Sequence, residues 1–120
     1  MVMIFLVAIG GAIGTLIRYL IFNFTSLTLT GTLLVNGIGC FGAGFFYRLL
    51  QIKNISPEYK MFILIGFIGS FTTFSAFIIE TFVLLEENKI FSAISSIFLN
   101  NIIGFLAFFI GILLAKLFFY

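Results

Sequence analysis

The 120-residue sequence contains no histidine and no aspartate, and its single cysteine is Cys40. Without these residues the chain has no Ser-His-Asp triad, no Cys-His pair and no histidine-containing zinc site. One cysteine forms no disulfide within the chain, and the apolar surroundings of Cys40 indicate a small packing residue. Most catalytic arrangements are thereby removed, and we expect a protein that is not an enzyme.

Charge is equally scarce, with six Lys or Arg, four Glu and a formal net charge of +2. Six scattered cations do not make the basic patch of a nucleic-acid-binding protein, so no nucleic-acid partner is expected. With a mean hydropathy of +1.33, the chain has too little charge to cover a water-facing surface. We therefore expect a multi-pass protein of the plasma membrane, surrounded by the lipid bilayer.

Four apolar stretches have the length of about 20 residues that a membrane-spanning helix needs. They cover about residues 2–23, 30–50, 61–84 and 91–119. The first lacks the basic region and cleavage site of a signal peptide and is expected to remain as a span. Because no room is left for a soluble domain, residues 1–120 are predicted to form one all-α unit of four transmembrane helices.

The third stretch contains a polar, glycine-bearing segment at residues 66–77, which reads GFIGSFTTFSAF. In hydrocarbon, irregular backbone is tolerated only where it is buried in protein or lines a wet cavity. One interpretation is a helix broken halfway across the membrane at an ion site, with unwound carbonyls at 69–73. The other is a continuous helix that tolerates Gly and Thr at a packing interface. From these residues alone, both remain open.

Polar residues in the other spans are further candidates for function. Thr32 and Asn36 lie four residues apart and share a helical face. A lone membrane amide either bonds to a neighbouring helix or offers its hydrogens to an ion, and both roles are open for Asn36. In the fourth span, Ser96 and Asn100 belong to a polar stripe with the same spacing.

Two charged residues fall within the spans. Arg18 either reaches the headgroups beside Tyr19 or faces inward and attracts anions at a pore mouth. An acid inside a span is a functional candidate by default, and Glu80 continues the helical face shared by Phe74 and Phe77. If Glu80 lies near the end of its span, it is simply hydrated.

Small residues recur along three of the spans, which predicts close contacts between helices. These strips are Gly10 and Gly14; Gly37, Cys40 and Gly44; and Gly104, Ala107, Gly111 and Ala115.

Three motifs follow one another along nearly the whole chain. They are Gly10-Gly11-x-x-Gly14-x-x-x-Arg18-Tyr19, Gly31-Thr32-Leu33-x-Val35-Asn36 and Gly66-Phe67-x-Gly69-x-x-Thr72-Thr73-Phe74-Ser75-x-Phe77. Together they closely resemble the Fluc (CrcB-type) family of fluoride channels. The resemblance implies passive, fluoride-selective export that protects the cell against fluoride. It also implies an antiparallel, dual-topology dimer with two fluoride pathways and one central sodium ion (Na+).

The same resemblance assigns roles to individual residues. Asn36 is expected to be a polar residue of the fluoride pathway, with the rings of Phe74 and Phe77 flanking the ion. The backbone carbonyls of Gly69 and Thr72 are expected to ligate sodium at the dimer axis. The other expected residues are Arg18 and Glu80 at the vestibule and Thr32, Ser75, Ser96 and Asn100 along the pathway.

Electrostatics agrees with these roles. The edge of an aromatic ring is positive, so ring edges hold a small anion without a fixed cation that would trap it. Moving a bare anion into low dielectric costs tens of kcal/mol. A hydrogen bond to a charged partner contributes about 1.5–3 kcal/mol, so several amide and hydroxyl donors are needed.

Two features depart from the family pattern. Family members often have tyrosine, followed four residues later by serine, where this chain has Ser96 and Asn100. There is also a mild positive-inside bias, which subunits that insert both ways should lack. With the N-terminus inside, Arg48, Lys53, Lys60 and Lys116 lie inside, and Arg18 and Lys89 lie outside. The partner is therefore either an identical chain or a paralogous subunit in a heterodimer.

Two other functions remain open. A proton-coupled multidrug-type exporter also has four spans of this length, but it needs a deep titratable carboxylate, for which Glu80 is the sole candidate. A non-transporting assembly subunit would pass no ions alone. The sequence has no Gly-x-x-x-x-Gly-Lys-Ser/Thr motif, so no P-loop for ATP is expected.

Overall fold

A computed structural model describes residues 2–25 and 29–119, and its regular structure is entirely helical. Three helices are continuous: α1 (Val2–Thr25), α2 (Leu29–Ile52) and the 30-residue α6 (Ile90–Phe119). The chain between α2 and α6 forms shorter helical pieces. These are α3 (Pro57–Lys60), the π-helical η1 (Met61–Ile68), α4 (Gly69–Phe71) and α5 (Phe74–Glu86).

Four segments of the described chain are long and apolar enough to cross a membrane. They are Val2–Thr25, Gly31–Ile52, Pro57–Glu86 and Ile90–Phe119. Their ends differ from the predicted limits by only a few residues, so the prediction of an all-α protein with four spans is confirmed.

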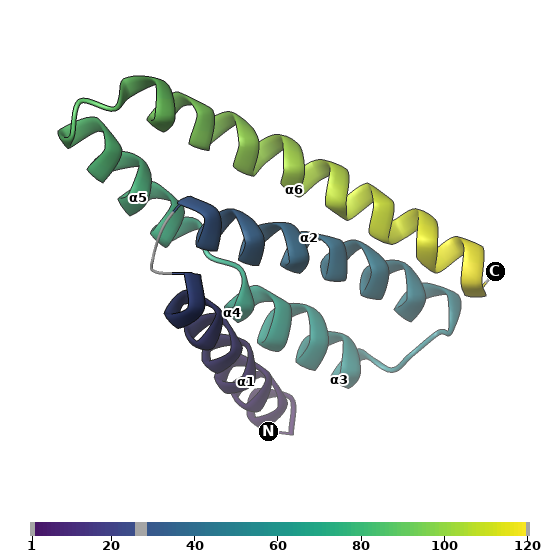
Figure 1. Ribbon diagram of the computed structural model, residues 1–120. Helices are drawn as coiled ribbons and strands as arrows, with labels where there is room; N and C mark the ends of the chain where they lie inside the picture. Colours follow the sequence, from purple (N-terminus) through teal and green to yellow (C-terminus); the bar gives the residue numbers. More distant parts are fainter. Residues whose placement is uncertain (1, 26–28, 120) are drawn as a thin grey trace.

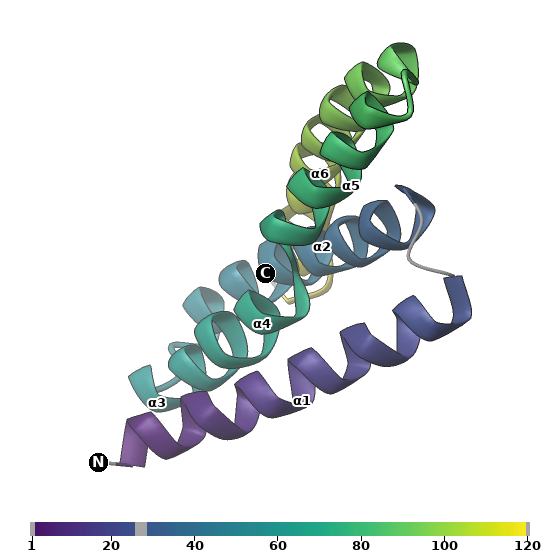
Figure 2. The same ribbon diagram turned by 90° about the vertical axis from the view of Figure 1, so that its left-hand side faces the viewer.

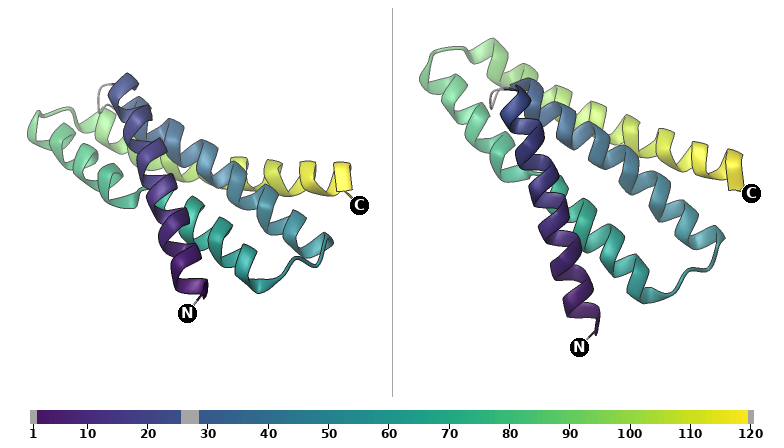
Figure 3. Two further views of the ribbon diagram at one scale, coloured as in Figure 1. Left: turned by 90° about the horizontal axis from the view of Figure 1, so that it is seen from below. Right: turned by 60° about the horizontal axis from the view of Figure 1, so that its bottom comes forward.

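The helices pack as two main pairs. α2 lies along α6, and α1 lies against η1 and α4 (Figures 1 and 2). Both termini and the connection between α2 and α3 lie towards one end of the molecule, and the turn between α5 and α6 lies at the other (Figure 3). This is the arrangement expected of four spans that cross a membrane in alternating directions.

Glycines allow both pairs to approach closely. A Cβ atom at Gly10 would lie 2.7 Å from the carbonyl oxygen of Phe62 in η1. Between α2 and α6, a Cβ at Gly44 would overlap the carbonyl of Phe108, and one at Gly111 would overlap the carbonyl of Phe41. The predicted small-residue strips therefore form helix contacts, where small side chains let backbones meet.

The third span is broken within the predicted segment, but over a shorter length than expected. Thr72 (φ −72°, ψ 155°) and Thr73 (φ −146°, ψ 113°) are extended and separate α4 from α5. Gly69 is helical, with φ −62° and ψ −29°, so the expectation of unwound backbone from residue 69 is wrong. Gly66 is buried against α1, where an added Cβ would lie 2.8 Å from the carbonyl oxygen of Val7. Gly66 thus serves packing against α1.

The contact at Gly44 gives a test of the α2–α6 packing. We expect Gly44→Ala to lower the free energy of unfolding by about 1–3 kcal/mol, because the new methyl group has no space. Gly42→Ala is the matched control, since its Cβ would lie 3.9 Å from the nearest side-chain atom and alanine favours helix by up to ~1 kcal/mol. Thermal unfolding in detergent measures both. Equal destabilisation by the two variants would contradict this packing.

Candidate functional site

The break brings two helix ends together near the middle of the third span. The C-terminal end of a helix carries free carbonyls and partial negative charge, whereas the N-terminal end carries free N–H groups and partial positive charge. Thr73 caps α5, because its Oγ1 accepts a hydrogen bond from the Ala76 N–H at 3.2 Å. The same hydroxyl lies 3.3 Å from that of Ser75. One short segment thus offers a cation-attracting end and an anion-attracting end.

Asn36 of α2 forms hydrogen bonds with backbone groups at the break. Its Oδ1 accepts from the Thr73 N–H at 2.8 Å, and its Nδ2 donates to the Thr73 carbonyl at 3.1 Å. Its Nδ2 also donates to Oδ1 of Asn100 at 3.3 Å. These bonds use both N–H groups of the amide. Of the two roles left open for Asn36, the structure shows the bond to neighbouring helices.

A cavity of about 220 Å³ opens beside the break. Its lining includes four of the predicted pathway residues, Asn36, Phe74, Phe77 and Asn100, together with the predicted sodium ligand Thr72. The other lining residues are Cys40, Thr73 and Asn101. The four predicted pathway residues come from three spans, and the fold places them around one space.

The two phenylalanines of the site meet at an angle. The ring centroids of Phe74 and Phe77 are 5.4 Å apart and their planes are inclined by 62°. Phe77 is buried, whereas Phe74 is 73% exposed on the single chain. Both rings line the cavity, and the exposed ring of Phe74 is free to contact a neighbouring molecule.

Asn100 carries a hydrogen-bond donor that the rest of the described chain does not use. Its Oδ1 accepts from Asn36, and its Nδ2 donates to the Ser96 carbonyl at 3.1 Å. An amide nitrogen has two hydrogens, and the second finds no acceptor within residues 2–25 and 29–119. Because Asn100 lines the cavity and is only 9% exposed, this N–H is available to a small anion.

Three other predicted pathway residues lie outside this lining. Ser96 is fully buried between α5 and α6, with its hydroxyl 3.5 Å from that of Thr81. Thr32 is also fully buried and donates a hydrogen bond to Glu80. Ser75 is exposed in the first turn of α5 and contacts Thr73. In this chain these hydroxyls therefore bond to protein groups.

Arg18 faces inward. Its Nη1 donates to the carbonyl of Thr72 at 3.1 Å, and α1 continues for about two further turns, to Thr25, before it ends. The interpretation in which Arg18 reaches the headgroups is therefore wrong. The guanidinium lies where the carboxyl end of α4 attracts positive charge.

The residues expected to ligate sodium lie in α4 and directly after it, and they offer backbone oxygens. In a continuous helix the Thr73 N–H would bond to the Gly69 carbonyl, but here it donates to Asn36. Gly69 is exposed on the surface of the single chain. The Thr72 carbonyl accepts from Arg18 and keeps its second lone pair. Hard backbone oxygens at a helix end are the ligands that coordinate Na+ in broken membrane helices.

The Glu80 side chain is hydrogen-bonded to α2. Its Oε1 accepts from Thr32, and its Oε2 is buried without a hydrogen-bond partner among the described residues. Thr32 belongs to the first turn of α2, where the helix dipole favours a negative charge. The interpretation of Glu80 as a simply hydrated residue is therefore wrong.

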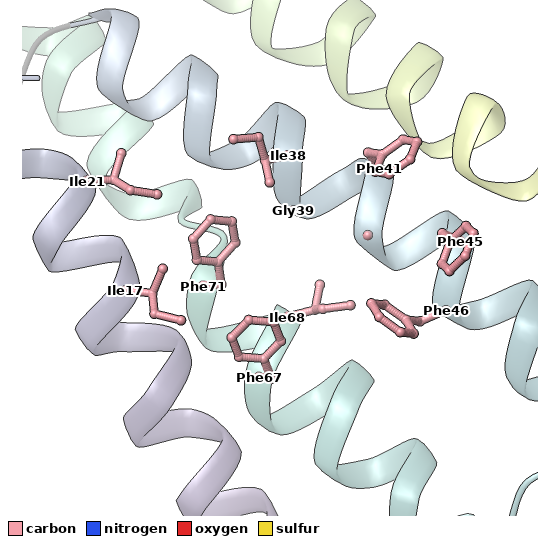
Figure 4. Close-up of a pocket in the computed structure, with 11 residues that line it drawn as sticks. Ile17, Ile21, Ile38, Gly39, Phe41, Phe45, Phe46, Phe67, Ile68 and Phe71 are labelled. Carbon is pink, nitrogen blue, oxygen red and sulfur yellow. The ribbon is translucent and has the colours of Figure 1, made fainter. Parts of the chain in front are cut away.

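A larger cavity of about 460 Å³ lies between α1, α2 and the η1–α4 piece (Figure 4). Phe67, Ile68 and Phe71 face it from the third span, and Ile17 and Ile21 face it from α1. Its residues are all apolar or glycine, so it offers no donor to an ion.

Sequence reasoning missed the importance of Gly39. A Cβ there would overlap Cγ2 of Thr72 and lie 3.1 Å from the ring of Phe71, so α2 passes directly against the break. The available signal was spacing, because Gly39 and Cys40 follow Asn36 by three and four residues and share its face. The role of Thr73 as a cap depended on the exact position of the break, which the sequence did not reveal.

A substitution that removes the Asn36 amide tests whether its bonds to Thr73 stabilise the break. Asn36→Ala leaves a buried N–H and a buried carbonyl unpaired, and each such group costs about 1–3 kcal/mol. We therefore expect a lower free energy of unfolding and faster hydrogen exchange at the Thr73 amide. Asn101→Ala is the matched control, because the Asn101 side chain is exposed and, among the described residues, bonds to the Ile97 carbonyl of its own helix. Similar losses in both variants would show that Asn36 does not hold the break.

The chain has clear relatives. The profile of the CrcB-like proteins, described as camphor resistance (CrcB), matches residues 5–112. A protein of Desulforapulum autotrophicum is 43% identical, with 92% of this chain and 94% of the relative covered. A protein of Parabacteroides distasonis is 36% identical, with coverage of 97% and 94%. Both relatives are named fluoride-specific ion channel FluC. With four spans and this match along most of its length, the chain is a multi-pass integral membrane protein of the cell membrane that belongs to the CrcB-like family.

Proposed function

We propose that this chain is a subunit of a channel that lets cytoplasmic fluoride leave the cell down its gradient. The observation that carries the proposal is the cavity at the break, where the spare N–H of Asn100 and the ring pair of Phe74 and Phe77 line one space. The names of the relatives agree with this function.

The cavity has features that allow an anion both to bind and to be released. The residues that line it include no Lys, Arg or Glu, so an ion meets partial charges from an amide, ring edges and the start of α5. Fixed full charges would bind too tightly for conduction. A small anion approaches such donors more closely than chloride does, and the stronger Coulomb attraction offsets part of its larger cost of dehydration.

The complete pathway in this proposal requires a second subunit in the opposite orientation. Gly69 and Phe74 are both exposed beside the break, so an antiparallel partner would bring two breaks together and cover the outer rings. The carbonyls of Gly69 and Thr72 from both subunits would hold Na+. When bound, the ion supplies positive charge that offsets the partial negative charge of the two α4 ends.

The charges favour a paralogous partner over an identical one. Arg18 lies at the break and belongs to neither end of the molecule. The remaining cations are four at the end that holds the termini, Arg48, Lys53, Lys60 and Lys116, and one, Lys89, at the other. This distribution is more asymmetric than the sequence suggested, and it favours one fixed orientation.

Ion release from liposomes tests the function. We expect the wild-type protein, alone or with its paralogous subunit, to release fluoride and to retain chloride. Phe74→Ile and Asn100→Leu remove a ring edge and a donor, and each should lower fluoride release at least about ten-fold, the effect of losing about 1.4 kcal/mol. Phe98→Ile is the matched control, since Phe98 is 62% exposed on α6 and does not line the cavity.

Unchanged fluoride release in Phe74→Ile and Asn100→Leu would contradict the pathway. Release by the single chain would establish an antiparallel homodimer, whereas release only with the second subunit would establish the heterodimer. Chloride release equal to that of fluoride would contradict the selectivity.

Resistance to cationic dyes distinguishes the channel from a proton-coupled exporter. An exporter exchanges protons for cations on a buried carboxylate, for which Glu80 is the candidate in the spans. We expect cells that express the wild-type chain to gain no dye resistance, and Glu80→Gln to change nothing in this assay. Dye resistance that disappears in Glu80→Gln would favour the exporter.

A further inference from the structure

A third cavity, distinct from the two already described, lies at the end of the molecule that holds the termini. It is an apolar groove of about 300 Å³ between the end of α2 and the start of the third span. Its lining residues are Phe46, Leu49, Leu50, Lys53, Ile55, Tyr59 and Ile63. Apart from Lys53 and the Tyr59 hydroxyl, these side chains are hydrocarbon, so the groove favours an apolar occupant.

The groove opens at the level of the membrane interface. α2 ends at Ile52, and the third span begins at Pro57. Lys53 and Tyr59 therefore belong to the headgroup region, while Phe46 and Ile63 lie deeper by one to two helical turns. Tyr59 is 61% exposed, as is typical of aromatic residues at the membrane–water boundary.

The connection that forms the mouth of the groove has a defined backbone. The Ile55 N–H donates to the Leu50 carbonyl at 3.1 Å, and the Lys53 N–H donates to the Leu49 carbonyl at 2.9 Å. Asn54 adopts the left-handed conformation with φ 47°, which is common where a helix ends. These bonds fix the position of the Lys53 backbone at the mouth.

The apolar stem of Lys53 lines this groove, and no carboxylate among the described residues pairs with its ammonium. Its Nζ lies 5.6 Å from the centroid of the Phe119 ring in α6. The ion pair found in the described part of the chain is that of Lys89 with Glu87, at the opposite end. A cation–π contact does not neutralise the ammonium, so Lys53 can bind an anionic group above the groove.

Cationic side chains outnumber acidic ones at this end of the molecule. Arg48, Lys60 and Lys116 belong to the same end of the molecule, where Glu58 is the acid. The Nε of Arg48 is buried and has no hydrogen-bond partner among the described residues. The opposite end has Glu86 and Glu87 against a single cation.

We propose that this groove binds an anionic phospholipid, with part of an acyl chain between α2 and the third span and the phosphate at Lys53. The apolar lining suits hydrocarbon, the mouth lies at headgroup level, and the charge of this end complements an anionic headgroup. A free phosphate would gain the lysine but nothing from the apolar walls. Since anionic lipids are enriched in the cytoplasmic leaflet, the bound lipid holds this end of the chain inside.

Native mass spectrometry and thermal unfolding of the purified full chain test this site. Phosphatidylglycerol and phosphatidylcholine with identical acyl chains serve as probes, and glycerol 3-phosphate serves as a headgroup without chains. We expect wild-type protein to bind phosphatidylglycerol at least about ten-fold more tightly than phosphatidylcholine and to unfold at a higher temperature in its presence. Glycerol 3-phosphate should produce neither effect.

Matched variants locate the site. Lys53→Gln should remove the preference for phosphatidylglycerol, and Lys53→Arg should keep it. Lys89→Gln, at the opposite end, should behave as wild type. Ile63→Trp fills the groove and should weaken binding of both lipids. Because Lys53 is at the surface and outside the ion cavity, these lipid readouts do not depend on fluoride conduction.

Several outcomes would overturn the proposal. They are equal binding of the two lipids by the wild type, a preference that survives in Lys53→Gln, or stabilisation by glycerol 3-phosphate that matches that of the lipid. A dimer mass that is independent of lipid and disappears in Lys53→Gln would instead identify a second copy of the chain as the occupant.

Discussion

The constraint on which this structure depends is the need to pair backbone groups in a helix that stops and restarts inside a membrane. Two extended residues, Thr72 and Thr73, interrupt the third span, and unpaired groups there would cost several kcal/mol each. Asn36 bonds both backbone groups of Thr73, and Arg18 bonds the Thr72 carbonyl. Side chains from α1 and α2 thus hold the break from two directions, and this explains why a polar amide and a guanidinium occur within apolar spans.

Once the break is stabilised, its chemistry follows from helix polarity. The carbonyls at the end of α4 attract a cation, and the N–H groups at the start of α5 attract an anion. Arg18 already contributes one positive group at the α4 end. The ring pair of Phe74 and Phe77 and the amide of Asn100 lie on the anion side. Partial charges of both signs therefore lie within a few residues, and the residues that line the cavity include no acid and no base.

The sequence predicted the features that depend on local pattern. Hydropathy located the four spans, and glycine spacing predicted the close contacts at Gly10, Gly44 and Gly111. The sequence could not show which residues form the break. Gly66 packs against a neighbouring helix, whereas the threonines have the extended backbone. The partner of Arg18 also stayed open, since that bond joins residues 54 positions apart. Such contacts depend on how helices cross, which spacing along one helix does not specify.

The hydrogen bonds of the fourth span give Asn100 a specific role in the proposed pathway. Both amide hydrogens of Asn36 are engaged, so another residue must supply the donor to an anion. Asn100 accepts from Asn36 and still has a spare N–H, whereas a serine hydroxyl has only one hydrogen to donate. The Ser96 carbonyl accepts the other hydrogen of the Asn100 amide and so fixes its orientation. In the proposed pathway, Asn100 therefore supplies the donor that Asn36 does not have free, and two neighbours hold its amide in place.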